Sequence, residues 1–189
     1  MANILDKSDV KNFLGIPSAA SADDTLITTI IAQIEAEIKT YCKRKYFQAT
    51  SLTEYYDGDG TDILLLKEYP IVSVTSLYDD TDRVYGSDTK IGSADIIIYG
   101  DEGYIRLDGL SFTKGEKNIK ITYKAGYGTG TGETAMPEDL KLALVMLASA
   151  VYLEGKAGVN VFENQEITYR PNQLRKDGYK IFDRYKKIR

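Results

Sequence analysis

The chain has 189 residues, of which 43% are hydrophobic and 28% charged, and a formal net charge of −4. This length and composition fit one compact soluble unit, and no apolar run approaches the ~18 residues of a membrane span, so a membrane protein is excluded. The chain has no histidine and one cysteine, Cys42, which excludes an internal disulfide, a His/Cys zinc site and a histidine-activated nucleophile.

A short helix is predicted over residues 6–14. Asp6 or Ser8 can cap its start, and Gly15 can end it. No basic region followed by an apolar stretch precedes this helix, so we expect no secretory signal and synthesis in the cytoplasm. The apolar side chains of the helix recur at helical spacing: Val10, Phe13 and Leu14.

A longer amphipathic helix is predicted over residues 21–45. Residues 21–24 offer a cap and acids for its first turn, and the cations at 43–45 lie where the helix dipole favours positive charge. The dipole explains this basic cluster without a nucleic acid. The apolar stripe is expected to serve the core or an oligomer interface through Leu26, Ile30 and Ile34, and it continues through Ile27, Ile31, Ile38 and Tyr41.

Residues 52–127 change to alternating β-branched and aromatic residues separated by glycine turns, which predicts a β-rich insertion of hairpins. The acidic turn at 57–62 is compatible with a calcium loop because Glu68 falls at the twelfth position. Asp62, however, stands where that loop needs glycine, so a plain hairpin turn is favoured. Candidate strands cover residues 52–56, 63–66, 71–78, 96–99, 104–107 and 118–123.

Three other features have a purely structural interpretation and a functional one. The glycine run at 126–132 resembles a phosphate-binding loop only in glycine content, so a flexible linker or lumen-facing loop is favoured. The carboxylate pairs at 79–80 and 101–102 are expected to be solvated turns rather than acid/base pairs. Cys42 is expected to be a small packing residue rather than a reactive thiol.

A third helix is predicted over residues 137–154, with Pro137 in its first turn. This helix carries apolar residues on almost all of its sides. Such a helix is usually buried between two layers of its own chain, or between its own chain and a second subunit. The stripe expected at the core or oligomer interface contains Leu140, Leu144, Leu147 and Val151.

The remaining residues, 159–189, are interpreted as a C-terminal arm, extended over 159–169 and ending in a basic helix over 173–188. Residues 170–189 hold eight basic and two acidic residues. This charge indicates a nucleic-acid arm, a tail that docks on an acidic neighbour, or a solvated helix face. Docking to a neighbouring subunit or a partner protein is assigned to Val161, Phe162, Ile167, Tyr169, Arg175, Lys176 and Arg184.

Five segments carry a family resemblance when they are read in order. They are residues 5–14, residues 23–31 leading to Ile38 and Tyr41, and residues 69–74, 118–127 and 137–143. As an ordered set they resemble the head–tail connector proteins of tailed bacteriophages, also called adaptor or head completion proteins. The β-rich middle resembles the larger variants of that family, and residues 159–189 match none of its motifs.

The resemblance implies an α+β fold in which the N-terminal and C-terminal helices pack together, with a β-rich insertion of hairpins in the middle of the sequence and residues 1–158 as the connector domain. It further implies a non-enzymatic virion protein at the head–tail interface, without cofactor or metal. Its copies would form a ring of about twelve subunits that binds the portal and receives the tail or a stopper (tail-completion) protein. Double-stranded DNA would pass through the lumen without specific binding, and an acidic body would repel its phosphates.

Three other classes of protein remain open. The first is a small nucleic-acid-binding protein that uses the basic tail, which predicts a DNA affinity that falls steeply with salt. The second is a sugar-binding module, because the chain has fifteen tyrosines and no tryptophan. A subunit interface is the favoured explanation of these tyrosines. A hydrolase is least favoured because no catalytic constellation is present.

Overall fold

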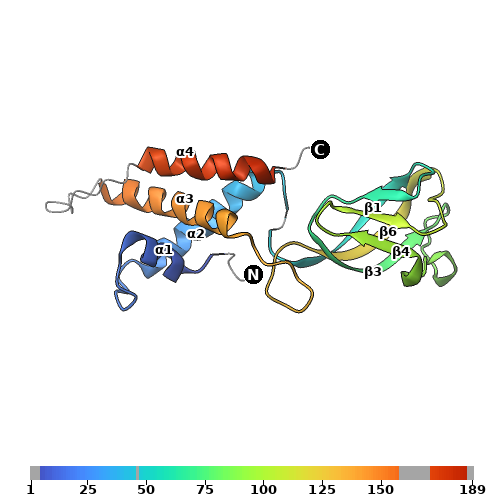
Figure 1. The fold of residues 1–189 in the computed structure, drawn as a ribbon, viewed down its shortest axis with the longest axis horizontal. Coiled ribbons are helices and arrows are strands. Elements are labelled where there is room, and N and C mark those ends of the chain that lie inside the picture. The colour runs from blue at the N-terminus through green and yellow to red at the C-terminus, as the bar shows by residue number, and fades with distance from the viewer. Residues whose placement is uncertain (1–4, 46, 158–170, 187–189) are drawn as a thin grey trace. The chain divides into compact units, whose positions relative to one another are not determined.

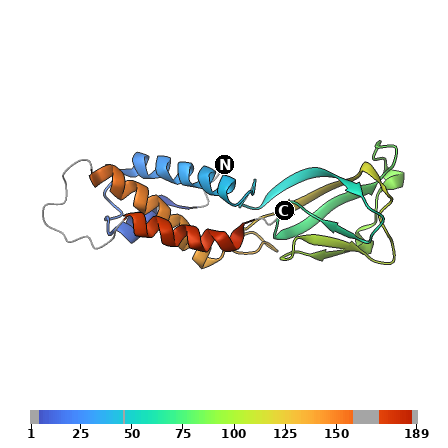
Figure 2. The same cartoon turned by 90° about the horizontal axis from the view of Figure 1, so that it is seen from above.

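The computed structural model describes residues 5–45, 47–157 and 171–186. Four helices and two antiparallel sheets confirm the predicted α+β class. Contacts divide the chain into two compact units (Figures 1 and 2). The helical unit comprises Met1–Lys45 and Met136–Arg189, and the β unit comprises Tyr46–Ala135. The chain length alone suggested one compact unit, whereas the β strands bury their apolar side chains in a core of their own.

Helix α1, Lys7–Leu14, is held at both ends by its own sequence. Asp6 accepts a hydrogen bond from the Ser8 N–H at 2.7 Å, and Asp9 accepts one from the Asp6 N–H, which completes a capping box. Gly15 ends the helix with a left-handed φ of 70°, a conformation that glycine adopts without steric cost. Both predicted ends are therefore confirmed.

Helix α2, Asp24–Tyr41, is shorter than the predicted 21–45. The helix cannot continue through Lys43, whose φ of 55° is left-handed. A lysine does not predict this conformation from sequence. The expected acidic side-chain cap is also absent. Asp23 instead accepts hydrogen bonds from the Tyr152 hydroxyl at 2.7 Å and the Lys156 ammonium at 2.9 Å, so it joins α2 to α3.

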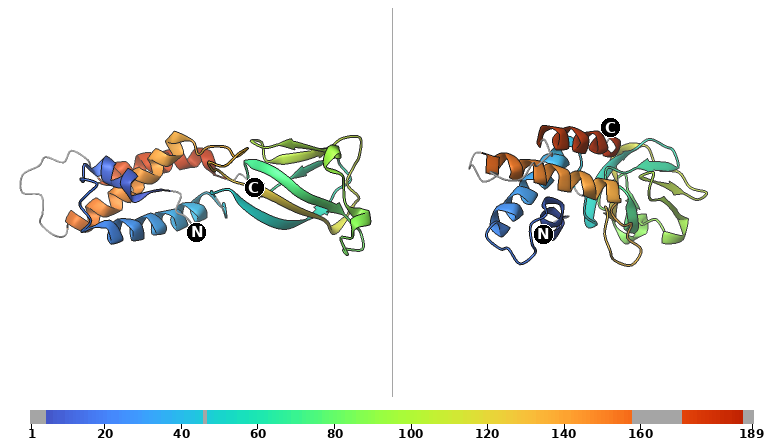
Figure 3. Two further views of the ribbon diagram at one scale, coloured as in Figure 1. Left: turned by 90° about the horizontal axis from the view of Figure 1, so that it is seen from below. Right: turned by 60° about the vertical axis from the view of Figure 1, so that its left-hand side comes forward.

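Helix α3, Glu138–Ala157, contacts α1, α2 and α4, which explains why it is apolar on most sides. Helix α4, Pro171–Phe182, packs along α3 (Figure 3). A Cβ atom at Gly178 would come within 3.2 Å of Leu147, so glycine allows the two helices to approach closely. The described part of the predicted C-terminal arm thus belongs to the helical unit and does not project from it.

The β unit contains two three-stranded sheets with the orders β1-β6-β3 and β2-β5-β4. All six predicted strands are present within a few residues: β1 Thr50–Gly58, β2 Ile63–Leu65, β3 Ile71–Asp79, β4 Ile96–Tyr99, β5 Tyr104–Leu107 and β6 Gly115–Ala125. Among them, β4 and β5 are the one pair of consecutive strands that forms a hairpin. The expectation of successive hairpins fails because β6 lies between β1 and β3 and pairs with both.

The acidic turn at 57–62 is a connection between the two sheets and not a hairpin turn, since β1 pairs with β6 and β2 with β5. The carboxylates of Asp57 and Asp59 accept hydrogen bonds from other residues of the chain. Asp59 accepts hydrogen bonds from the Thr61 N–H at 2.9 Å and the Thr61 hydroxyl at 2.7 Å. Asp57 accepts one from the Lys117 N–H at 2.7 Å.

The glycine run at 126–132 is more ordered than a flexible linker. Tyr127 is buried and forms bridges to Gln48 and Thr134. Glu133 accepts a hydrogen bond from the Gly130 N–H at 2.9 Å and pairs with Lys124. The pKa of the Glu133 carboxyl is lowered, mainly by Lys124 and then by Gly130. The glycine content of the run did not predict this folded loop, because the residues that bond to it lie outside the run: Gln48, Glu133 and Thr134.

Candidate assembly surfaces

Most residues predicted for the core or oligomer interface lie inside the helical unit. Five are buried and Val151 is half-buried, whereas Leu26 remains 44% exposed. The buried five are Ile30, Ile34, Leu140, Leu144 and Leu147. Since these side chains are occupied by the chain's own packing, any partner of α2 or α3 would meet other side chains.

The outward side of α2 carries no charge over three turns. We call it the neutral face, and its exposed residues are Thr25, Leu26, Thr28, Thr29, Ala32, Gln33 and Ala36. Of the acids of α2, Asp24 begins the helix and pairs with Lys7 and Lys11, Glu35 is buried, and Glu37 is exposed one turn beyond Gln33, where it contacts Tyr179. In a chain with 28% charged residues, this is the composition expected of a protein–protein contact, because charged side chains are depleted at interface centres.

The basic residues of the C-terminal helix are largely paired within the chain, which reduces the positive field available for a nucleic acid. Arg175 makes a two-pronged contact with Glu154, with nitrogen–oxygen distances of 3.0 and 2.7 Å. Arg184 approaches Asp139 at 3.5 Å, and Lys176 is exposed. Further pairs join Lys180 to Asp177 and Lys186 to Asp183.

Four of the predicted docking residues, Val161, Phe162, Ile167 and Tyr169, lie outside the described residues. The three that are described, Arg175, Lys176 and Arg184, come from α4 and the turn after it. A hollow of about 690 Å³ lies beside that turn, lined by Glu37, Thr40, Tyr41 and Tyr179.

One loop of the β unit is held rigidly by a buried carboxylate. Asp80 accepts hydrogen bonds from three backbone N–H groups, those of Asp82, Val84 and Tyr85, at 2.6–3.0 Å. These bonds, that of Tyr85 first, lower the pKa of the Asp80 carboxyl. Val84 at the loop tip is 78% exposed. The predicted solvated turn at 79–80 is therefore wrong for Asp80, which organises the loop around it.

Tyrosines gather at two places on the surface of the β unit. Tyr85 packs against Tyr55 and Tyr78, with ring centroids 5.5 and 6.5 Å apart. On the other sheet, Tyr99 and Tyr104 stack at 4.4 Å. The tyrosines inside the unit serve its core, so the total of fifteen overstated the aromatic surface available to a partner.

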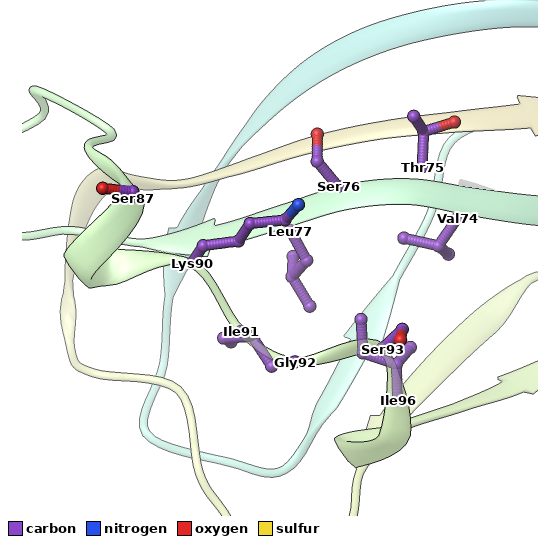
Figure 4. A pocket seen from close by; sticks show the side chains of 10 residues that line it. All are labelled: Val74, Thr75, Ser76, Leu77, Ser87, Lys90, Ile91, Gly92, Ser93 and Ile96. Atoms are coloured by element: carbon purple, nitrogen blue, oxygen red, sulfur yellow. The ribbon is translucent and has the colours of Figure 1, made fainter.

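A seam runs along the outer edge of β3, between the two sheets. Hydrogen bonds close it at both ends, from the Ile71 N–H to the Gly100 carbonyl and from the Ile91 N–H to the Leu77 carbonyl, each at 2.9 Å. Between these points lies a hollow of about 380 Å³ (Figure 4). Its lining residues are Val74, Thr75, Ser76, Leu77, Ser87, Lys90, Ile91, Gly92, Ser93 and Ile96.

Metal binding and thiol chemistry have no support among the described residues. Within 5–45, 47–157 and 171–186, no group of three or more His, Cys, Asp or Glu side chains could hold a metal ion. Burial raises the pKa of the Cys42 thiol to about 11, which makes it a poor nucleophile and confirms its packing role. No helix in the part of the chain that the structure describes is long and apolar enough to cross a membrane.

The fold is similar to that of proteins in the necks of gene transfer agent particles. A chain from the neck of an empty particle computed with C6 symmetry has a TM-score of 0.63 and 17% identity, with 100% of this chain and 94% of that one covered. A chain from the neck of a native particle computed with C12 symmetry has a TM-score of 0.59 and 16% identity, covering 100% and 93%. A third, from the native virion, has a TM-score of 0.58 and 18% identity, covering 98% and 90%.

The curated proteins contain no match to this sequence. A family model described as "HCP: Head completion protein" matches residues 3–187, nearly the whole chain. The match includes both units, so the β-rich middle belongs to the family's pattern. The resemblance seen in the ordered sequence segments is thereby confirmed, and the chain belongs to the head completion protein family, structural proteins of the phage head–tail junction.

Proposed function

We propose that copies of this chain form a ring between the portal and the tail of a phage or phage-like particle, with double-stranded DNA passing through its lumen. The observation that carries the proposal is the family match over residues 3–187, and the likeness to chains from necks computed with C6 and C12 symmetry supports it. A cyclic ring of about twelve copies follows if this chain occupies the equivalent place. The role is structural, and the chain acts after synthesis in the host cytoplasm by assembling into the virion.

A ring needs two different complementary surfaces on each subunit, because each copy contacts one neighbour on either side. The neutral face of α2 is our candidate for one of them. It presents Leu26 together with small, uncharged side chains, and its Thr and Ala residues lose little side-chain entropy on contact. The apolar stripes of α2 and α3 hold the helical unit together, so we assign the contact of α2 with the wall of the ring to its outward side.

The charge of the chain suits a channel that DNA passes through without adhering. The net charge is −4, and cations of α4 and of the turn after it are paired: Arg175 with Glu154, Arg184 with Asp139 and Lys186 with Asp183. Negative surfaces repel phosphate, whereas tight DNA binding requires many available Lys and Arg side chains. These ion pairs therefore favour the connector over the nucleic-acid-binding alternative.

Complementation of a particle that lacks this chain tests the proposal. Leu26→Glu on the neutral face should abolish infectious particles while leaving the monomer folded, because a charge enters an exposed position that becomes buried only on assembly. Val84→Glu, an equal change at the exposed loop tip of the β unit, is the matched control for an added surface charge. Leu147→Glu does not serve, because Leu147 is 1% exposed and its replacement unfolds the helical unit.

Normal head–tail joining by the Leu26→Glu protein would remove α2 from the ring wall. Head–tail joining in the complete absence of this chain would refute the connector function itself.

A further inference from the structure

The seam beside β3 has an incomplete edge. Thr75 is left out of the β3–β6 register at an irregularity between Val74 and Ser76. On the other side of the strand, the hydrogen bonds among the described residues that reach the 87–100 segment lie at its two ends, at Ile71 and Leu77. The middle of the strand thus presents an edge of the kind to which an extended segment can add.

The hollow in this seam has a mixed lining suited to a peptide. Figure 4 shows Val74 and Leu77 pointing from β3 toward the side where Ile91 and Ile96 lie, while Thr75 and Ser76 point the other way. Hydroxyls of serine and threonine border these apolar side chains. Lys90 is the one charged residue in the lining. An extended segment with alternating apolar and polar residues and a negative charge would complement this lining.

Residues 159–169 of the same sequence supply these residue types, and apolar and polar residues alternate at 159–161 and again at 167–169. The segment carries two acids, Glu163 and Glu166, and no base. Its apolar residues gather toward both ends of an otherwise polar stretch: Val159, Val161, Phe162, Ile167 and Tyr169. Thirteen residues separate Ala157 from Pro171, a long connection for two helices that pack on one another, and connections of that length are often functional.

We propose that a short stretch within residues 159–169 of one subunit docks in the β3 seam of a neighbouring subunit, adding a strand beside the middle of β3 with its acids toward Lys90. This inference rests on the proposed ring, and it adds a second contact between neighbours to the one at α2. Because both ends of the segment are tethered to helices, the connection can extend out and back by about 20 Å at ~3.3 Å per residue, so only the residues near its turning point pair with β3. The inference requires that the ring holds the neighbour's seam within this reach.

Photo-crosslinking in the assembled ring tests this inference. A benzoyl-phenylalanine residue replaces Phe162 or, separately, Tyr169, and the labelled protein is assembled from a mixture of heavy-isotope and normal subunits, alone or with portal protein. We expect crosslinks between heavy and normal subunits that join these positions to residues 71–77 or 87–96. The same photo-reactive residue at Tyr55, on the surface of the β unit, is the control for chance contact.

A blocking variant supplies an independent readout. Ser93→Arg places a second cation at the edge of the hollow, where Ser93 is exposed, and should raise about tenfold the protein concentration needed for assembly because it obstructs the seam. Val84→Arg adds the same charge at the loop tip and should leave that concentration unchanged.

The outcomes separate this inference from the proposed function. A ring that forms normally while the crosslinks fall within one subunit, on the helical unit or on the portal overturns the seam inference and leaves the ring standing. A ring that assembles equally well with Ser93→Arg also overturns it. A chain that forms no ring, alone or with portal protein, refutes the proposed function and the inference with it.

Discussion

The Lys11 ammonium donates a hydrogen bond to the Asp24 carboxylate at 2.7 Å and thereby ties α1 to the first residue of α2. Lys11 is almost completely buried, and its ammonium also donates to the Ser18 and Ala20 carbonyls. Lys7 reaches the other oxygen of the same carboxylate, but its side chain is 47% exposed. One carboxylate therefore holds a buried cation and a solvated one.

This difference predicts unequal effects of the two lysines. Lys11→Met should lower the free energy of unfolding by about 2 kcal/mol, because it removes charge-assisted hydrogen bonds from a buried site. Lys7→Met should lower it by less than about 1 kcal/mol, since exposed ion pairs contribute little. Chemical denaturation followed by circular dichroism measures both, and equal losses would contradict the assigned roles.

The same carboxylate predicts a pH dependence. Hydrogen bonds from Lys11 and then Lys7 lower the pKa of Asp24 below its ordinary 3.8. A lowered pKa in the folded state means that the stabilisation is complete above about pH 5 and is lost as the pH falls through 4 and below. Asp24→Asn should therefore be less stable than the parent at pH 7, with a difference that narrows toward pH 2. A difference that stays constant over that range would exclude this linkage.

The core of the β unit contains a polar network that can be tested separately. The Tyr123 hydroxyl donates to the Glu54 carboxylate at 2.8 Å and accepts from the Glu68 N–H at 3.2 Å. Tyr56 donates to the same Glu54 oxygen at 2.5 Å. Tyr123→Phe should lower the stability of the β unit by about 1–3 kcal/mol, because it leaves buried polar groups without a partner.

Tyrosine fluorescence during denaturation reports this change, as the chain has no tryptophan. Tyr55→Phe, which removes an exposed hydroxyl from the same sheet, should change stability by less than about 0.5 kcal/mol. A Tyr123→Phe protein as stable as Tyr55→Phe would show that the network contributes nothing net.

Two glycines should respond to alanine in opposite directions. Gly126 has φ 115°, and a Cβ there would lie 2.7 Å from the backbone of Gln48. Gly126→Ala should therefore lower the free energy of unfolding by about 2–4 kcal/mol. Gly155 lies in α3 with open space around it, so Gly155→Ala should raise the free energy of unfolding by about 0.5–1 kcal/mol. Thermal unfolding of the two variants measures the pair, and a Gly126→Ala protein as stable as the parent would contradict the close approach.

The sequence predicted local structure better than long-range contacts. The capping residue Asp6, the terminating Gly15 and the six strands follow from periodicity and turn chemistry, which act over a few residues. The pairing of β6 with both β1 and β3 joins residues that are 40 (Asp79 and Ile119) to 75 (Thr50 and Ala125) positions apart, and no local signal carries it. The end of α2 at Tyr41 was missed because the left-handed backbone of Lys43, two residues later, is not predicted by its residue type.

For the candidate surfaces too, local structure was predictable from the sequence and long-range contacts were not. Helical periodicity correctly identified the apolar stripes of α2 and α3, but the stripes alone could not show that the chain's own helices cover Leu144 and Leu147 while Leu26 stays exposed. The neutral face could have been found as the charge-free side of that periodicity. The seam could not, because it depends on how the two sheets close around β3.

Assembly into a ring at the head–tail junction can be tested by the mass of the assembled protein. Light scattering measures this mass for the purified protein, alone and mixed with the portal protein of the same particle. We expect a DNA-independent complex of about twelve copies in at least one of the two samples. A protein that stays monomeric in both, and gains mass only when DNA is added, would contradict it and favour nucleic-acid binding instead.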